Sequence, residues 1–271
     1  MGTPTDRPEE APDLSVAIVC KNNRATIGRT LESVRGLARE VVAVDSGSTD
    51  GTIELLESGG ATVIRSEWLG HVKTKQRALE ACSCAWVLSL DSDESPEPEL
   101  IESIRGFLES PDPHVDGARV NRRIWYQGEP LEHAWQPEWR LRLVRRGKAA
   151  WGGLDPHDKL DLLPNAGASV DLGGHLRHDS FERFADHLEA QAKHARTMAR
   201  SLHNAGRGTG YLRPWISAVA AFVKQLLLRG SWRDGRAGWL AAYSSAIGAF
   251  GKHVCLLEMR SHREPGDGSD A

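Results

Sequence analysis

The sequence predicts an α/β protein with a mostly parallel, Rossmann-like central sheet and C-terminal amphipathic helices. Between residues 14 and 90, short apolar runs rich in β-branched residues alternate with segments of helical periodicity, a pattern typical of βαβ units. Beyond residue 210, apolar residues recur at spacings of three and four, which indicates amphipathic helices. The 271 residues suffice for one large domain with an appendage.

Strands and helices are expected to alternate along the first ninety residues. Gly36 and the pair Gly59 and Gly60 mark the ends of the first two helices. Asp45 and Asp91 stand at the carboxyl ends of two strands, and ligands of open α/β sheets bind outside those ends. The expected strands are residues 15–20, 41–45, 61–64 and 85–90, and the expected helices are residues 27–37, 53–56 and 75–81.

The middle of the chain has less regular patterning. Pro96 and Pro98 open an expected helix that runs to Leu108, because Pro suits the first turn of a helix. An extended stretch is expected at residues 118–126 and a long helix at residues 181–204. Between them, residues 127–175 form a lobe rich in Gly, Pro and Trp, with one short strand at residues 141–144.

The chain is expected to divide into four segments. The N-terminus is Pro-rich and acidic and lacks the basic start and apolar stretch of a secretory signal. Four cysteines lie among apolar neighbours without paired metal-ligand spacing, which favours reduced thiols in a cytoplasmic protein; they are Cys20, Cys82, Cys84 and Cys255. The expected segments are a disordered leader, an α/β domain, a helical region and a disordered tail, at residues 1–13, 14–178, 179–260 and 261–271.

The charge is distributed unevenly along the chain. The formal net charge is −3, yet residues 191–260 carry eleven Lys or Arg against two acidic residues, a net of +9. This asymmetry indicates an anionic partner, such as a nucleic acid or an anionic lipid surface, and a solvated basic helical face is the alternative.

The C-terminal helices combine these cations with two apolar stripes. Only fifteen uncharged residues lie between Arg236 and Lys252, whereas a membrane-spanning helix needs about twenty apolar residues. We therefore expect helices that lie in the membrane interface rather than cross it. The alternative is packing on the α/β domain or on a partner subunit. The stripes are Leu212, Trp215, Ile216, Val219, Phe222, Val223, Leu226 and Leu227, then Trp239, Tyr243, Ile247, Phe250, Val254 and Leu257.

A pair of carboxylates follows the last of the expected parallel strands. Asp91 and Asp93 are one residue apart in the segment DSDE, so both emerge on one side of the strand end. Such oxygens suit Mg²⁺ or Mn²⁺, which is commonly held by one or two carboxylates and the phosphates of a substrate. The triplet D-x-D also occurs widely in acidic loops, and its place after a parallel strand is what favours a metal clamp.

Small residues follow the second strand. The segment DSGSTDGT at residues 45–52 suits a tight turn whose backbone approaches a ligand. Asp45 is a candidate acceptor for hydrogen bonds from a base or ribose. The alternative is that Ser48, Thr49 or Asp50 caps the following helix. Capping needs only one of these residues, so Asp45 would still be available to bind a ligand.

Several segments together resemble a known family. Residues 15–23 (SVAIVCKNN), 44–52 (VDSGSTDGT) and 91–94 (DSDE) resemble, in order and spacing, the inverting glycosyltransferase family 2, which has the GT-A fold. The segments WLG at 68–70, KQRAL at 75–79 and the pattern R-G-x-x-x-D-G-x-x-G at 229–238 look like the lipopolysaccharide core β-glucosyltransferase branch. The family resemblance covers residues 14–160, and the narrower one extends to residue 258.

The resemblance implies a set of donor-site residues. Cys20 and Asp45 would line the nucleoside site, and Asp93 would bind the metal. Lys75 would lie near the diphosphate, where a compact positive charge suits phosphate oxygens, although a solvated helix lysine is the alternative. Asp91 would contact the ribose or the metal. Gln76 stands where this branch usually has Asn.

An inverting transfer also needs a general base for the acceptor hydroxyl. In this branch a His-Glu pair follows an Arg-Leu-Phe strand, and the counterpart here is RLVRR at residues 142–146 followed by His157 and Asp158. We expect Asp158 to be the base, one methylene shorter than Glu, with Asp155 as the reserve. His157 would bind the diphosphate or orient Asp158, unless it is a structural loop histidine.

The predicted function is metal-dependent transfer of a sugar, with Mn²⁺ or Mg²⁺, from a UDP-hexose to a lipid-linked or lipopolysaccharide core acceptor at the inner face of the cytoplasmic membrane. A nucleotidyltransferase would usually have a Gly-rich loop bearing Arg or Lys directly after the first strand. It is disfavoured because residues 20–24, which follow that strand, contain no Gly. Nucleic-acid binding is disfavoured because the C-terminal cations are interleaved with apolar stripes rather than with exposed stacking aromatics. A non-catalytic nucleotide-binding scaffold at the membrane surface is the remaining alternative.

Overall fold

The computed structural model describes residues 12–154, 157–179 and 183–261. The chain forms two compact units. The first comprises residues 1–123 and 137–180, and the second comprises residues 124–136 and 181–271. The chain therefore leaves the first unit at residue 124, returns at residue 137 and leaves again at residue 181. Most of the expected leader and tail lies outside the described residues.

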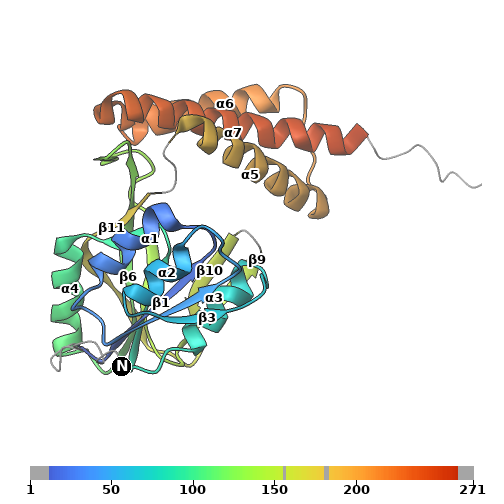
Figure 1. The fold of residues 1–271 in the computed structure, drawn as a ribbon. Helices are drawn as coiled ribbons and strands as arrows, with labels where there is room; N and C mark the ends of the chain where they lie inside the picture. The colour runs from blue at the N-terminus through green and yellow to red at the C-terminus, as the bar shows by residue number, and fades with distance from the viewer. Residues whose placement is uncertain (1–11, 155–156, 180–182, 262–271) are drawn as a thin grey trace, which may run out of the picture. The chain divides into compact units, whose positions relative to one another are not determined.

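The N-terminal half of the first unit is a parallel sheet with helical crossovers (Figure 1). The register pairs Cys20 with Asp45 and Val19 with Asp91, so the predicted donor-site residues meet at one edge of the sheet. The predicted alternation of strands and helices is confirmed. The elements are β1 (Leu14–Cys20), α1 (Arg24–Ser33), β2 (Glu40–Asp45), α2 (Thr52–Ser58), β3 (Thr62–Arg65), α3 (His71–Glu80) and β4 (Trp86–Asp91).

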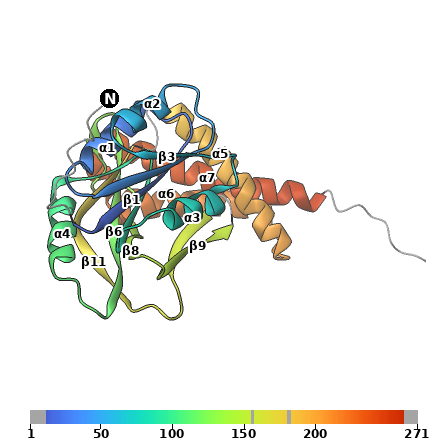
Figure 2. The same cartoon turned by 60° about the horizontal axis from the view of Figure 1, so that its bottom comes forward.

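Antiparallel strands extend this sheet on the far side of β4. The strand order is β3-β2-β1-β4-β8-β6-β11-β5, and β9 and β10 form a separate antiparallel pair. In both views α4 lies beside β11 (Figure 2). The elements are β5 (Glu94–Pro96), α4 (Pro98–Glu109), β6 (Val115–Tyr126), β8 (Trp139–Arg145), β9 (Ala149–Leu154), β10 (His157–Leu162) and β11 (Ala168–His178).

The core lies on both faces of the central strands. Val16 and Ile18 belong to one apolar cluster and Ala17, between them, belongs to another. Successive side chains of a strand point to opposite faces, and a strand covered on both faces is apolar throughout. Burial on two faces explains why β1 reads as the continuous apolar run that was predicted.

The second unit is helical, apart from a hairpin at residues 124–136 that contains β7 (Glu129–Pro130). The long helix α7 packs against both α5 and α6. The expected long helix is observed as α5. The helical elements are α5 (Phe184–Asn204), α6 (Arg213–Val223), a π-helical turn η1 (Lys224–Leu228), a 3₁₀ turn η2 (Ser231–Asp234) and α7 (Gly235–Ser261).

Asp234 fastens the hairpin to the helices. Its carboxylate, almost fully buried, accepts hydrogen bonds from the backbone N–H groups of His133 (3.0 Å) and Ala134 (2.7 Å) and contacts His133 Nδ1 at 2.9 Å. A Cβ on Gly238 would lie 1.6 Å from the carbonyl oxygen of Ser231. The pattern at residues 229–238 is therefore a packing motif of the second unit, since its Asp and its last Gly are each required by a close contact.

The second unit exposes many large apolar side chains. Tyr211 is 87% exposed and Leu228 is 80% exposed, whereas monomeric soluble proteins rarely expose large contiguous apolar patches. We call this set the apolar face. Its members are Tyr211, Leu212, Trp215, Ile216, Val219, Val223, Leu227, Leu228, Trp232, Trp239, Tyr243 and Ile247.

Within the described residues, one helix is long and apolar enough to cross a membrane by length and composition, at Ser231–Met259. The count of fifteen uncharged residues did not anticipate it, because the helix continues on both sides of Arg236 and Lys252.

Candidate active site

The loops that follow β1 and β2 are joined by hydrogen bonds between the two sequence motifs. The side-chain Oδ1 of Asn22 accepts a hydrogen bond from the backbone N–H of Thr49 at 2.9 Å. The backbone N–H of Asn22 donates to Ser48 Oγ at 2.8 Å. The N–H of Asn23 donates to Thr52 Oγ1 at 2.8 Å. The two motifs thus form one rigid rim at the carboxyl edge of the sheet.

Asp45 is held by this rim. Its Oδ1 accepts the N–H groups of Gly47 and Ser48, each at 2.9 Å, and its Oδ2 contacts the Ser48 hydroxyl and Cys20 Sγ. Burial opposes ionisation, yet the hydrogen bonds from Ser48 and Gly47 lower the pKa of Asp45 below its usual value. Burial, and then the Asp45 carboxylate, raises the pKa of the Cys20 thiol. Cys20 is consequently a neutral thiol. It lies beside the Asp45 carboxylate, which already accepts hydrogen bonds from Gly47 and Ser48.

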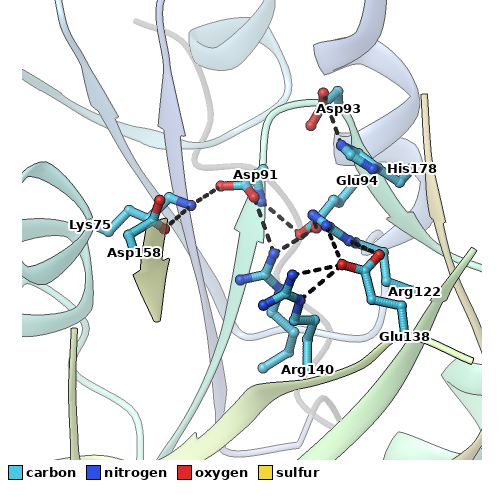
Figure 3. A network of polar contacts seen from close by, with 10 residues as sticks. Lys75, Asp91, Asp93, Glu94, Arg122, Glu138, Arg140, Asp158 and His178 are labelled. Carbon is cyan, nitrogen blue, oxygen red and sulfur yellow. Dashed lines mark hydrogen bonds and ion pairs between the residues drawn. The ribbon is translucent and has the colours of Figure 1, made fainter. Parts of the chain in front are cut away.

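Lys75 joins two of the predicted site carboxylates. Its Nζ lies 2.6 Å from Asp91 Oδ1 and 2.8 Å from Asp158 Oδ2 (Figure 3). The same Nζ lies 4.6 Å from the ring centre of Trp151. These side chains come from α3, β4, β10 and β9. Residues more than eighty positions apart in the sequence are thus brought together at one buried ammonium group.

Buried charges continue from Asp91 towards β6 and β8. Arg142 donates to Asp91 Oδ2 at 3.1 Å and to Glu94 Oε1 at 2.6 Å. Burial opposes the ionisation of Asp91, but Arg142 and then Lys75 hold its pKa well below the usual range. Asp91 therefore stays ionised although its side chain is mostly buried.

Two further arginines complete the network. Arg122 contacts Glu94 at 3.2 Å and Glu138 at 2.7 Å, and Arg140 also donates to Glu138 at 2.7 Å (Figure 3). Burial alone would raise the pKa of Glu138. Arg122 and then Arg140 outweigh this effect, so the pKa of Glu138 lies below its usual value. The sequence did not identify Arg122, Glu94 or Glu138 as members of the site, because pairing across strands brings them together.

Asp93 has a different neighbour from Asp91. Its Oδ2 lies 3.4 Å from Nε2 of His178 (Figure 3), which the register of β11 with β5 sets opposite Glu94. The Nδ1 atom of His178 is buried without a hydrogen-bond partner in the described part of the chain. Sequence reasoning missed His178 because β11 was not predicted.

Asp93 and His178 are a second candidate pair of metal ligands, and the predicted pair of Asp91 and Asp93 stays a prediction. Both oxygens of Asp91 are engaged by Lys75 and Arg142, whereas Asp93 and His178 offer a carboxylate and an imidazole that face each other. The described residues contain no group of three His, Cys, Asp or Glu side chains arranged as a complete metal site. Waters and substrate phosphates commonly complete such a shell.

The Gln76 side chain links two elements of the first unit, α3 and β9. Gln76 Oε1 accepts the backbone N–H of Trp151 at 2.9 Å, and its Nε2 donates to Glu80 at 2.7 Å, so Gln76 ties α3 to β9. His157 is the first residue of β10, and its side chain lies outside the described residues, as does Asp155.

A cavity of about 580 Å³ opens beside the charged network. Three predicted site residues, Lys75, Asp91 and Asp158, line it. Cys20 and Asp45 are not among its lining residues. The remaining lining residues are Arg119, Arg122, Trp139, Arg140, Leu141, Arg142, Trp151, Lys159, Leu160, Asp161, Leu162 and Ser169.

A parallel sheet with acidic residues at its carboxyl edge and a buried lysine beside a polar cavity is the arrangement of an α/β enzyme that handles a polar or charged substrate. Residues 15–157 match the sequence profile of the family described as Glycosyl transferase family 2. The chain belongs to glycosyltransferase family 2, and it is a glycosyltransferase.

The chain is similar over most of its length to individual members of this class. It is 31% identical over 249 residues to the lipopolysaccharide core biosynthesis glycosyltransferase LpsC of Rhizobium meliloti, covering 88% of this chain and 89% of LpsC. It is 27% identical over 255 residues to an uncharacterised glycosyltransferase of Rickettsia typhi, covering 91% and 86% of the two chains. The mannosyltransferase PcManGT of Pyrobaculum calidifontis, solved with GDP-Man and Mn²⁺, has a TM-score of 0.50 at 16% identity over 92% and 89% of the two chains. This likeness confirms the predicted GT-A fold.

Proposed function

We propose that the protein transfers a hexose from UDP-hexose, with inversion and with a divalent metal, to a lipid-linked or lipopolysaccharide core saccharide. The observation that carries the proposal is the meeting of Lys75, Asp91 and Asp158 at the edge of the cavity. The similarity to LpsC supports the acceptor class. UDP-hexose as the donor follows from the resemblance to the β-glucosyltransferase branch.

The donor end of the proposed site is the rim formed by the loops after β1 and β2. Cys20 and Asp45 would border the nucleoside, with Asp45 acting mainly by fixing the backbone of its turn, since its oxygens already accept four groups. Gln76 would act by positioning Trp151. From the family resemblance, His157 would contact the diphosphate or orient Asp158.

The leaving diphosphate is stabilised by fixed positive charge. Lys75 and Arg142 are both buried and both contact Asp91. Preorganised charges in a water-poor site need little reorganisation when negative charge develops, which is why such groups usually supply a large part of the rate enhancement.

Asp158 is the proposed general base. It reaches the cavity from β10 and is oriented by Lys75 at 2.8 Å. As the acceptor oxygen bonds to the anomeric carbon, the bond to the diphosphate breaks on the opposite face and the hydroxyl proton passes to an oxygen of Asp158. The diphosphate leaves with the electron pair of the broken bond.

Asp93 and His178 would hold the metal. Carboxylates suit Mn²⁺ and Mg²⁺, and histidine is a common metal ligand in proteins. When bound, such an ion supplies further positive charge for the diphosphate. The proposal therefore replaces Asp91 by His178 as the partner of Asp93, and leaves Asp91 the role of holding Lys75 and Arg142 in place.

The deciding experiment is a calorimetric titration of the purified protein with UDP, with and without Mn²⁺. The wild type should bind UDP more tightly with Mn²⁺, and both Asp93→Ala and His178→Ala should lose the Mn²⁺ dependence. His114→Ala, an exposed histidine away from the cavity, is the matched control and should behave as the wild type. Absence of UDP binding in the wild type under every metal condition would contradict the proposed function. Metal-dependent UDP binding without any transfer would favour the nucleotide-binding scaffold.

The second unit is the proposed membrane-binding part. Its apolar face is bordered by exposed cations, among them Arg213, Lys224 and Arg229, and this pairing suits the interface of an anionic bilayer. The helix α7 packs against α5, which carries Lys193 and Arg196. Insertion of α7 across a bilayer would take these charges into the hydrocarbon at a large cost, so we place the helices in the interface.

A further inference from the structure

Two sets of residues with different chemistry line the cavity. One set is Lys75, Asp91 and Asp158, which the proposed function uses. The other set is Arg119 of β6 with Trp139 and Arg140 of β8, to which the proposed reaction gives no role; we call the part of the cavity that this set lines the arginine end.

Each of these two guanidinium groups is fixed on one side only. Arg119 donates from Nε (2.6 Å) and Nη2 (2.8 Å) to the two oxygens of Asp171. Arg140 donates from Nε (3.1 Å) and Nη2 (2.7 Å) to Oε1 of Glu138. Among the described residues, no side chain or backbone group accepts a hydrogen bond from Nη1 of either arginine. Both groups are therefore held in place with donors still available.

Both arginines are also accessible. The side chain of Arg119 is 48% exposed and that of Arg140 is 42% exposed, whereas Arg142 in the same cavity is buried. A ligand in the cavity can reach the first two without displacing the core of the network.

Two arginines share one carboxylate at this end, because Arg122 and Arg140 both contact Glu138. The three guanidiniums of Arg122, Arg140 and Arg142 share the carboxylates of Glu94 and Glu138. The other carboxylate that reaches Arg142, Asp91, is also paired with Lys75. Arg140 therefore shares the carboxylate of Glu138 with a second arginine, and the planar fork of Arg matches the oxygens of a carboxylate or phosphate.

Trp139 gives this end a flat apolar surface. It is partly exposed, and the Arg119 guanidinium lies 5.9 Å from its ring centre. An aromatic ring beside charged donors suits a ligand that is partly apolar on one face and anionic at one position. A sugar ring with an acidic substituent has both properties.

We propose that Arg119 and Arg140 bind an anionic substituent, a phosphate or a carboxylate, on the saccharide acceptor. The proposal rests on the proposed function, because it assumes that the acceptor enters this cavity. It makes the arginine end a specificity site that selects an acidic sugar over a neutral one.

The test measures binding of three simple probes, glucose, glucose 6-phosphate and glucuronate, to protein saturated with UDP and Mn²⁺. Saturation fills the donor site, so the phosphate probe cannot report on the diphosphate position. We expect the wild type to bind at least one acidic probe about tenfold more tightly than glucose, as a charge-assisted contact allows. Preference for the phosphate or for the carboxylate would identify which group the site takes.

Arg140→Gln should remove the preference, and Arg119→Gln is the second variant should the first fail to fold. Arg146→Gln is the matched control, because Arg146 is exposed just after β8 and does not line the cavity. Equal affinity of the wild type for all three probes would overturn the proposal, and so would an equal loss in Arg146→Gln. Affinity for UDP is measured separately in each variant, so failure of the donor site is distinguished from failure of this inference.

Discussion

The ammonium group of Lys75 lies 2.8 Å from Oδ2 of Asp158. This contact joins a helix of the parallel half of the sheet to the small β9–β10 sheet. It places the proposed base within reach of the group that would meet the leaving diphosphate, and so links the two ends of the proposed displacement.

Asp158→Asn should separate transfer from donor binding. Loss of a general base typically costs about 10²- to 10⁴-fold in rate, so kcat should fall in that range while the dissociation constant of UDP changes less than about threefold. Initial rates with a UDP-sugar and calorimetry with UDP are the two measurements. Asp112→Asn, on an exposed turn before β6, serves as the control. A parallel loss of rate and UDP affinity would contradict the assignment.

The Asp45 turn should contribute to stability in a pH-dependent way. Hydrogen bonds lower the pKa of this carboxyl in the folded state, so its contribution is present above the unfolded value of about 3.9 and is lost as the pH falls through the lowered folded value. We expect Asp45→Asn to unfold at a lower urea concentration than the wild type at pH 7, and the gap to narrow towards pH 3. A gap that is constant from pH 7 to pH 3 would show that ionisation of Asp45 does not matter.

Gly238→Ala should destabilise the second unit. The new methyl group would meet the Ser231 carbonyl at 1.6 Å, and overpacking of this kind costs about 1 to 3 kcal/mol or more. Gly251→Ala in the same helix is the matched control, because its Cβ would lie at an ordinary 3.4 Å from Ala195 and Ala favours helix over Gly by about 1 kcal/mol. Thermal unfolding followed by circular dichroism compares the two. Equal melting temperatures would show that the Ser231 contact relaxes.

Ile216→Glu should weaken membrane binding. Ile216 is exposed on the apolar face, and a carboxylate there opposes both insertion and attraction to anionic lipid. In flotation assays the wild type should bind phosphatidylglycerol-containing liposomes better than neutral ones, and less at high salt. Ser201→Glu on α5 adds the same charge away from the apolar face and should bind as the wild type. Equal flotation of the two variants would exclude the apolar face as the docking surface.

Much of the fold followed from the sequence because its strongest patterns are local. The apolar runs of β1, β2 and β4 and the glycines after the helices were sufficient to predict the parallel half of the sheet. The pairs β9–β10 and β11–β5 were not predicted, because their residues mix polar and apolar types without clear alternation.

The same limit applies to the candidate site. Lys75, Asp91 and Asp158 were named from a family resemblance, and the structure brings them together. The partner of Asp93 could not be named, since His178 reaches it only through an antiparallel pairing across more than eighty residues. Charges such as Glu94 and Arg122 gain their meaning from partners that no spacing in the sequence reveals.

The fastening of residues 124–136 to the helices by Asp234 has a consequence for how such enzymes can be recombined. The helical unit is assembled from two separate stretches of the chain, so cutting at residue 181 would strip Tyr126, Leu131 and Ala134 of apolar neighbours such as Ala241. A chimera that exchanges the helical unit between relatives should carry the hairpin with it. Such exchanges would then test whether the surface to which an enzyme is delivered can be changed without altering the sugar that it transfers.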